Sequence, residues 1–421
     1  MGRQWRKMGG AMSTSDLIYD WNRYPSNPLR LRGPVMLTDE SLRDGLQSPS
    51  VRDPSIEEKL EILRLMEALG INILDLGLPG AGPRAVEAVT ALAKEIVASG
   101  MNIRAYCAAR TLENDIYPIA EIMQKTGLPI AAATFLGSSP IRRFTEDWTD
   151  DFLLKTTETA VKFAQSLGIE VMYVTEDTTR CDAETVKRLY RCAIECGAKA
   201  VVICDTAGHS TPDGAYALVK FVIDEVVKPS GEDIRVDWHG HNDRGLAVAN
   251  SLAALLAGAH NVHGCALGIG ERVGNTQLDQ MLVNLRLMGV TPWDKQDMSR
   301  LKEYCVAVSR ATGVPIPANY PVIGDDAFRT ATGVHAAAVI KAFKKSDLEL
   351  ANTVYSGVPS HLFGLEQVID VGPMSGKSNV LWWLEKRGIP ATEDVVERVY
   401  QRAKASDHTL SEAEILECVG R

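Results

Sequence analysis

The chain has 421 residues, of which 45% are hydrophobic and 24% are charged, a composition typical of a globular protein. Its formal net charge of −9 argues against a nucleic-acid-binding protein, which would need a basic stripe on its surface. The sequence has neither an apolar run of about 18 residues nor the pattern of a secretory signal, so we expect a cytoplasmic protein that does not enter membranes. The eight cysteines form no CxxC pair and lie mostly in apolar segments, which predicts buried free thiols.

From residue 35 onward, short apolar runs alternate with amphipathic helical patterns. The expected strands cover 35–41, 71–77, 102–109, 129–137, 169–177, 198–208, 234–243 and 261–270. The expected helices cover 55–70, 84–100, 113–127, 150–168, 182–197, 213–227, 246–259 and 275–289. Most of these helices end in glycine, the residue favoured just beyond a helix C-terminus. Eight strand–helix units in about 255 residues predict an α/β protein whose catalytic domain, residues 35–290, is a (β/α)8 TIM barrel.

Two segments flank this barrel. Residues 1–34 read as an N-terminal extension. After residue 290 the alternation stops: a helical pattern at 297–313 is followed by a Pro/Gly-rich stretch and several short helices. We therefore expect a smaller, mostly helical C-terminal subdomain at 291–421.

Polar side chains gather where the expected strands end. The residues are Asp44, Asp75, Arg110, Glu176, Asp177, Asp205, Thr206, His239, His241 and Glu271. Parallel barrel strands all end at the same mouth, which is where enzymes with this fold keep their active sites. Burying so many charged groups costs free energy. A barrel with no active site would have little reason to place them at this mouth, so we expect an active site there.

The sequence DWHGHND places His239 and His241 two residues apart at the end of the seventh strand. Because side chains alternate along a strand, both imidazoles face the same side. Such a pair suits a metal ion, a substrate anion or a hydrogen-bonded core. Asp44 after the first strand and Asn275 after the eighth favour the first choice, with Mg²⁺, Mn²⁺ or Zn²⁺ all compatible with these donors.

A metal held this way would keep positions open for substrate and would act as a Lewis acid. Arg43, next to Asp44, would bring a fixed cation to a developing oxyanion. The other histidines have no comparable setting and are expected to be structural: His209, His260, His263, His361 and His408.

Several motifs together resemble the DRE-TIM metallolyase barrels, in particular the 2-isopropylmalate, homocitrate and citramalate synthases. Within the barrel these are RDGLQSP, EDTTRCDAETV, DTAGHSTP, HGHNDRGLAVAN and GIGERVGN. Beyond it, PANYPVIGDDAFRTATGVHAAAVIK and VYSGVPSHLFG extend the similarity into the subdomains that follow the barrel. The resemblance runs from about residue 36 to the C-terminus.

The resemblance implies a metal-dependent Claisen condensation of acetyl-CoA with a 2-oxo acid, which releases CoA. The motifs imply that Asp44, His239 and His241 hold the metal, with Asn275 as a ligand or support. The implied catalytic residues are Arg43, Glu271, His335 and Tyr355, and either Glu271 or His335 would remove the methyl proton. The family also implies a homodimer in which the C-terminal subdomain reaches the neighbouring active site.

Substrate contacts are expected at Gln47, Asp75, Arg142, Glu176 and Thr206. Asp75 stands where the family usually has glutamate, which leaves its role open. Leu46 resembles the hydroxymethylglutaryl-CoA lyases instead, but those lyases carry a catalytic cysteine in a GGCP loop where this chain has GIGERVGN. The synthase interpretation is therefore favoured over a carbon–carbon lyase and over a non-catalytic metal-binding barrel.

The 2-oxo acid is less defined by the sequence. Arg142 could bind a second carboxylate, which would suit 2-oxoglutarate or oxaloacetate, or it could face solvent or the phosphates of CoA. Leu78, with the small residues around it, suits an apolar side chain such as that of 2-oxoisovalerate. We favour a 2-isopropylmalate synthase-like reaction, with homocitrate, citramalate, Re-citrate and benzylmalate synthesis as alternatives. No leucine-binding regulatory domain fits after the subdomain, so we expect no feedback inhibition through one.

Overall fold

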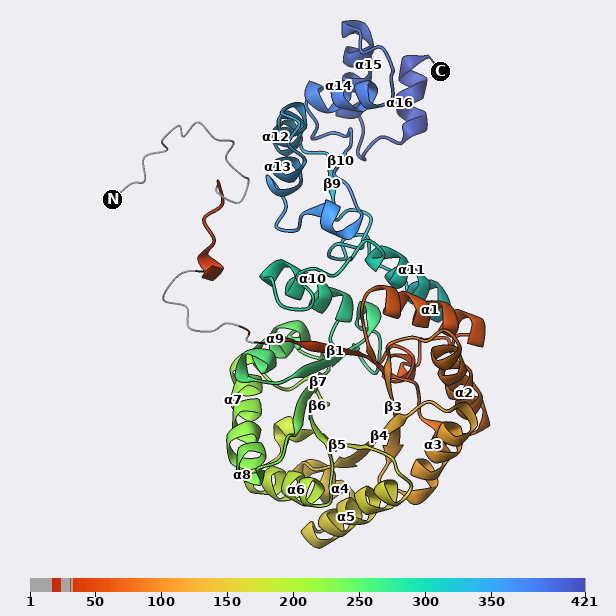
Figure 1. The fold of residues 1–421 in the computed structure, drawn as a ribbon. Helices are drawn as coiled ribbons and strands as arrows, with labels where there is room; N and C mark the ends of the chain where they lie inside the picture. The colour runs from red at the N-terminus through yellow and green to blue at the C-terminus, as the bar shows by residue number, and fades with distance from the viewer. Residues whose placement is uncertain (1–16, 24–30, 32, 421) are drawn as a thin grey trace, which may run out of the picture. The chain divides into compact units, whose positions relative to one another are not determined.

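The computed structural model describes residues 17–23, 31 and 33–420. Eight parallel strands close into a barrel in chain order, which confirms the predicted TIM barrel (Figure 1). The strands are β1 Met36–Asp39, β2 Ile73–Asp75, β3 Arg104–Arg110, β4 Ile130–Gly137, β5 Val171–Glu176, β6 Ala200–Asp205, β7 Arg235–Gly240 and β8 Asn261–Gly264. Hydrogen bonding between β1 and β8 completes the ring.

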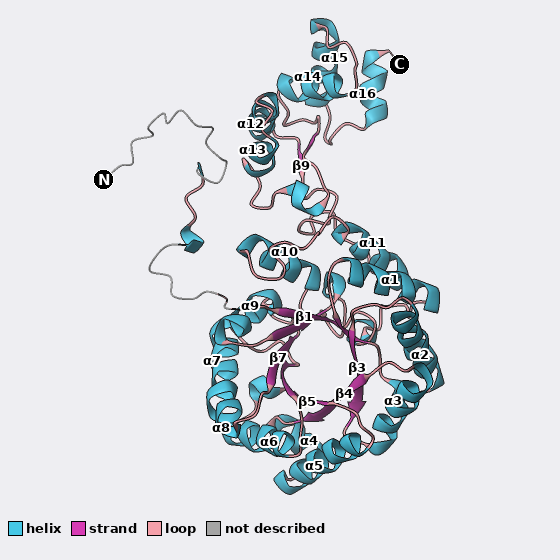
Figure 2. Cartoon of the chain, viewed as in Figure 1, coloured by secondary structure: helices cyan, strands magenta, loops and turns pink. Residues whose placement is uncertain are grey.

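Helices surround the strands, as the cartoon makes clear (Figure 2). The eight expected helices are α1 Ile56–Ala68, α2 Pro83–Ala98, α3 Glu113–Thr126, α5 Asp150–Ser166, α6 Ala183–Glu195, α7 Pro212–Val222, α9 Ala247–Ala257 and α10 Leu278–Met288. One helix after β4 was not expected: α4, Pro140–Glu146. Ser139 caps it by accepting a hydrogen bond from the Arg142 amide, and Pro140 occupies its first turn, a sequence that favours helix initiation.

The barrel interior is apolar along one part of its wall and polar along another. Buried side chains of β2 to β6 form an apolar cluster: Ile73, Tyr106, Ala133, Met172, Ala200, Val202 and Cys204. Charged and polar side chains are buried where β1, β7 and β8 meet: Thr38, Glu40, Asp237, His239, Asn261 and His263. The polar part leads to the barrel mouth, so it is the part that positions the candidate site.

Two compact units divide the chain, and residues 31–316 form the unit that contains the barrel. Helix α11, Leu301–Thr312, belongs to this unit and packs against α1. The described helices of the other unit are α12 Gly333–Lys344, α13 Leu348–Thr353, α14 Lys377–Lys386, α15 Glu393–Lys404 and α16 Glu412–Val419. A two-stranded sheet joins β9 Arg329–Thr330 to β10 Val368–Ile369. The mostly helical appendage is thus confirmed, whereas its boundary at residue 290 stays a prediction.

All eight cysteines are free thiols. Cys107, Cys204, Cys265 and Cys305 are buried, as the sequence predicted, whereas the other four are only partly buried and do not fit that prediction: Cys181, Cys192, Cys196 and Cys418. Among the described helices, none combines the length and the apolar character that a membrane span requires.

The packing of β8 against the loop that follows it requires a glycine at position 264. A Cβ added at Gly264 would lie 2.7 Å from the backbone carbonyl oxygen of Thr276, which cannot move without shifting the loop after β8. We expect Gly264→Ala to lower the free energy of unfolding by about 1–3 kcal/mol, measured by urea denaturation. Gly357→Ala, where an added Cβ meets nothing within 4 Å, is the control. Equal midpoints for the two variants would contradict the crowding at β8.

Candidate metal-binding active site

Three predicted metal ligands converge at the C-terminal mouth of the barrel. Asp44 begins the short 3-10 helix η3, Asp44–Gln47, that follows β1, while His239 lies on β7 and His241 directly after it. The Nε2 atoms of His239 and His241 are 3.2 Å apart. Asp44 Oδ2 lies 3.9 Å from His239 Nε2 and 3.7 Å from His241 Nε2. The pairing predicted from alternation along the strand is confirmed by this geometry.

These three atoms fit one divalent cation. Ligands about 2.1 Å from a common ion lie roughly 3–3.5 Å from each other, close to the observed spacing. Burial and the neighbouring His239 lower the pKa of His241 to about 4, so its imidazole is neutral near neutral pH, which is the charge state that binds a cation. The buried carboxylate of Asp44 supplies the anionic donor.

Asn275 supports this group from the loop after β8. Its Nδ2 donates to Asp44 Oδ2 at 2.8 Å and to the Ile269 carbonyl at 3.1 Å. Its Oδ1 is buried and has no hydrogen-bond partner within the part of the chain described. Asn275 therefore fixes the orientation of Asp44, and a role as a fourth ligand through Oδ1 stays a prediction.

Arg43 is held by three carboxylates. Its Nε donates to Asp75 Oδ2 at 2.6 Å, its Nη1 to Asp44 Oδ1 at 2.7 Å and its Nη2 to Glu40 Oε1 at 3.3 Å. Burial disfavours the charge of Arg43, but the three anions outweigh that cost and hold its pKa well above the ordinary value. The predicted fixed cation beside the metal ligands is thus present.

Asp75 lies behind Arg43 and does not line the cavity at the barrel mouth. It is 1% exposed, and besides Arg43 it accepts a hydrogen bond from the Gly77 amide. Its placement suits a group that orients Arg43 better than one that contacts substrate.

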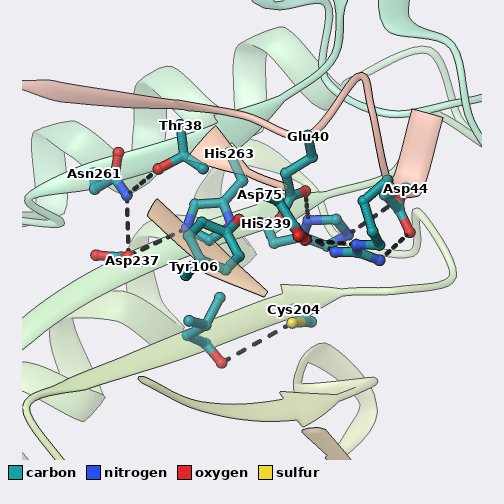
Figure 3. A network of polar contacts seen from close by, with 12 residues as sticks. Thr38, Glu40, Asp44, Asp75, Tyr106, Cys204, Asp237, His239, Asn261 and His263 are labelled. Atoms are coloured by element: carbon teal, nitrogen blue, oxygen red, sulfur yellow. Dashed lines mark hydrogen bonds and ion pairs between the residues drawn. The ribbon is translucent and has the colours of Figure 1, made fainter. Parts of the chain in front are cut away.

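Glu40 and His263 were missed as site residues by the sequence analysis. Both are buried and line the cavity, and Figure 3 shows them beside His239. The Nδ1 atoms of His239 and His263 lie 2.7 Å and 2.9 Å from the two oxygens of Glu40. The two-residue period from Thr38, which turns Glu40 into the barrel, is the signal for Glu40. His263 was expected to be structural, because the sequence around it resembles no metal-binding or catalytic motif.

A cavity of about 230 Å³ opens next to the metal ligands. Five predicted substrate or catalytic residues line it: Arg43, Gln47, Glu176, Thr206 and Glu271. Glu176 is largely buried, and burial raises the pKa of its carboxyl group. Glu271, in contrast, has a side chain that is 52% exposed and lies 3.6 Å from Arg272.

Arg142 does not line this cavity. It lies on α4, pairs with Glu146 at 3.2 Å and lies over the Trp148 ring. It lines a neighbouring hollow that shares Glu176 and Thr206 with the cavity. Its proposed contact with substrate therefore stays a prediction.

Three other residues at strand ends interact with the segment that follows their own strand. Arg110 pairs with Asp115, and Asp177 pairs with Arg180. Asp205 accepts hydrogen bonds from the backbone amides that follow β6. Position at a strand end was thus a useful signal for the site but not a sufficient one.

His335 and Tyr355 lie in the appended unit. His335 is near the start of α12, and its ring centroid is 4.3 Å from that of Tyr355. Both side chains are exposed. The structure thus brings these two predicted residues together, and their part in catalysis stays a prediction.

Comparison with known proteins shows the family to which this chain belongs. Residues 34–305 match the HMGL-like family model, so the chain belongs to the HMGL-like family. It is 32% identical over 371 residues to a probable 2-isopropylmalate synthase from Methanopyrus kandleri, covering 88% of this chain and 69% of that protein. It is 33% identical over 373 residues to homocitrate synthase AksA of the same organism, and the match covers 88% of this chain and 87% of that protein. The HMG-CoA lyase structure from Bacillus subtilis matches in fold, with a TM-score of 0.55 at 18% identity, over 69% of this chain and 97% of that one.

The metal ligands can be tested without any substrate. We expect His241→Ala to reduce Mn²⁺ affinity by at least about 100-fold, because it removes one of three converging ligands. Mn²⁺ binding is measured by electron paramagnetic resonance of the free ion. His408→Ala, which removes an exposed histidine of the appended unit, should bind Mn²⁺ as the unaltered protein does. Tight binding by both variants would place the metal elsewhere.

Proposed function

We propose that this protein condenses acetyl-CoA with a 2-oxo acid and releases free CoA, as a 2-isopropylmalate synthase does. The carbon–carbon bond forms between the acetyl methyl carbon and the keto carbon, and water then cleaves the thioester to give a 2-hydroxy dicarboxylate. The observation that carries the proposal is the convergence of Asp44, His239, His241 and Arg43 on one cavity. The 2-isopropylmalate and homocitrate synthase relatives support the same reaction class.

Asp44, His239 and His241 would hold the divalent metal, with Mg²⁺, Mn²⁺ and Zn²⁺ all compatible. When bound, the ion would supply Lewis-acid polarisation of the keto group. Arg43 would stabilise the negative charge that develops on the keto oxygen, because its guanidinium is fixed before the reaction begins. Asp75 and Glu40 keep that guanidinium from turning toward solvent.

Glu176 is the group we assign to removal of the methyl proton. It lines the cavity, and its raised pKa makes it a stronger base than an ordinary carboxylate. Glu271 and His335, the candidates from the sequence motifs, are both exposed. We assign them, with Tyr355, to contacts with acetyl-CoA or to proton transfer later in the reaction. A homodimer that brings the appendage of one chain to the barrel of another belongs to the same proposal.

The cavity favours a 2-oxo acid with an apolar side chain. Seven apolar or weakly polar side chains line its inner wall: Ala108, Ala133, Phe135, Met172, Val174, Val202 and Cys204. The arginine that lines it, Arg43, is already paired with three carboxylates. A second substrate carboxylate would thus lose its water without gaining a free cation, which disfavours 2-oxoglutarate and oxaloacetate.

A carbon–carbon lyase of the hydroxymethylglutaryl-CoA type is less well supported. Such an enzyme uses a cysteine in the loop after β8, whereas Cys265 here is fully buried and lies outside the cavity lining. Burial also raises the pKa of that thiol well above its ordinary value, which keeps it protonated.

Release of free CoA from acetyl-CoA tests the reaction directly. With Mg²⁺ or Mn²⁺ present, we expect release to be fastest with 2-oxoisovalerate and at least about tenfold slower with 2-oxoglutarate, since the apolar wall rejects a charged end. Asp44→Asn should abolish release. No release with any 2-oxo acid, together with cleavage of hydroxymethylglutaryl-CoA, would replace the synthase with the lyase; loss of both activities in a metal-loaded protein would favour a non-catalytic barrel.

Glu176 and Glu271 both line the cavity, and they allow a matched comparison for the base. We expect Glu176→Gln to lower kcat by about 100-fold or more with little change in the KM for the 2-oxo acid, because general-base catalysis contributes that much. Glu271→Gln keeps the same shape at the exposed position and should lower kcat far less. The reverse order of effects would assign the proton transfer to Glu271.

A further inference from the structure

A chain of buried polar groups runs through the barrel beneath the candidate metal ligands. It links Asp237, His263, Glu40 and His239, which lie next to one another in Figure 3. Asp237 and Glu40 are 0% and 2% exposed. Burying two carboxylates costs free energy, and the weak contact of Glu40 with Arg43 does not account for the rest of this arrangement.

Glu40 is the centre of this chain. Its Oε2 lies 2.7 Å from His239 Nδ1, and its Oε1 accepts hydrogen bonds from the Tyr106 hydroxyl at 2.7 Å and from His263 Nδ1 at 2.9 Å. Arg43 Nη2 adds a weaker contact at 3.3 Å. Four donors around one carboxylate keep it ionised and fix its position.

An ionised carboxylate can only accept hydrogen bonds, so the proton of the His239 ring must lie on Nδ1. The other nitrogen, Nε2, is then left with its lone pair pointing at Asp44 and His241. We propose that Glu40 is a positioning residue for the metal: it fixes His239 in the tautomer and orientation that presents Nε2 to the cation. The inference rests on the proposed metal site, but not on the identity of the 2-oxo acid.

His263 anchors Glu40 from the opposite side. Its Nδ1 faces Glu40, and its Nε2 lies 3.1 Å from Asp237 Oδ2. Both carboxylates only accept, so both ring nitrogens of His263 donate. Asp237 is fixed in turn by Arg235 Nε at 2.9 Å and by Asn261 Nδ2 at 3.0 Å.

The same three groups, Glu40, His239 and His263, could in principle bind a second cation, because their ligand atoms lie within 4.8 Å of one another. The direct contacts of 2.7 Å and 2.9 Å argue against it. An ion between these atoms would have to break both hydrogen bonds. The number of ions bound per chain therefore separates a positioning role from a ligand role.

The test measures Mn²⁺ binding to the metal-free protein, so it does not depend on turnover. We expect Glu40→Gln to weaken Mn²⁺ binding by about 10–100-fold, the loss typical of removing a partner of a metal-bound histidine. The unaltered protein should bind one ion per chain at this site. Unchanged affinity in Glu40→Gln, or two ions per chain in the unaltered protein, would overturn the proposal.

Tyr304→Phe is the matched control. Tyr304 donates a buried hydrogen bond to Asp39, the residue before Glu40, and its described hydrogen bonds do not involve His239. Its loss should lower stability to thermal unfolding while leaving Mn²⁺ affinity within about twofold. If both variants lose affinity equally, the effect of Glu40 is structural and the proposal fails.

A spectroscopic measurement on the unaltered protein covers the case in which Glu40→Gln does not fold. Histidine labelled with ¹⁵N in the ring distinguishes the two tautomers, and the His239 signal is the one lost in His239→Asn. We expect the Nδ1–H form in the metal-free protein at mildly alkaline pH. An Nε2–H form would overturn the proposal. Loss of Mn²⁺ binding in His241→Ala with an Nε2–H tautomer would leave the metal site standing and remove only the role of Glu40.

Discussion

The candidate site depends on charge neutralisation at the mouth of the barrel. Arg43 is surrounded by Asp44, Asp75 and Glu40 at hydrogen-bonding distance, and none of these groups could be buried alone without a large desolvation cost. Together they leave a net negative environment beside two imidazoles. A divalent cation is the natural complement of that environment, so the electrostatic requirement of folding and the binding of a metal point in the same direction.

Much of the fold could be predicted because the sequence repeats one simple pattern. Alternating apolar runs and amphipathic helices located all eight strands, and the spacing of His239 and His241 placed both rings on one face. Helix α4 escaped the prediction because it is short and its start depends on a local cap at Ser139 and Pro140. A helix of seven residues is too short to show the amphipathic repeat by which the longer helices were predicted.

The residues of the candidate site that stand at strand ends could be predicted, whereas the residues that act through buried contacts could not. Asp44, His239 and His241 were predicted from residue type, position at strand ends and family motifs, and the structure brings them together. Glu40 and His263 were not, because their importance lies in contacts between β1 and β8, which are far apart in sequence. Asp75 faces Arg43 and Arg142 pairs with Glu146, both outside the lining of the cavity, so their expected substrate contacts stay predictions. Distances between side chains of neighbouring elements cannot be read from residue type.

The apolar wall of the cavity has a consequence for the evolution of substrate choice. Ala108 and Ala133 each contribute a single methyl group on adjacent strands β3 and β4, where the backbone is held rigidly by the barrel. Exchange of either alanine for a larger residue would reduce the space in the cavity for a substrate side chain. The candidate metal ligands, which follow or lie on β1 and β7, would not be disturbed. A lineage of such barrels could therefore move between shorter and longer keto acids by changes at two positions, while the chemistry stayed the same.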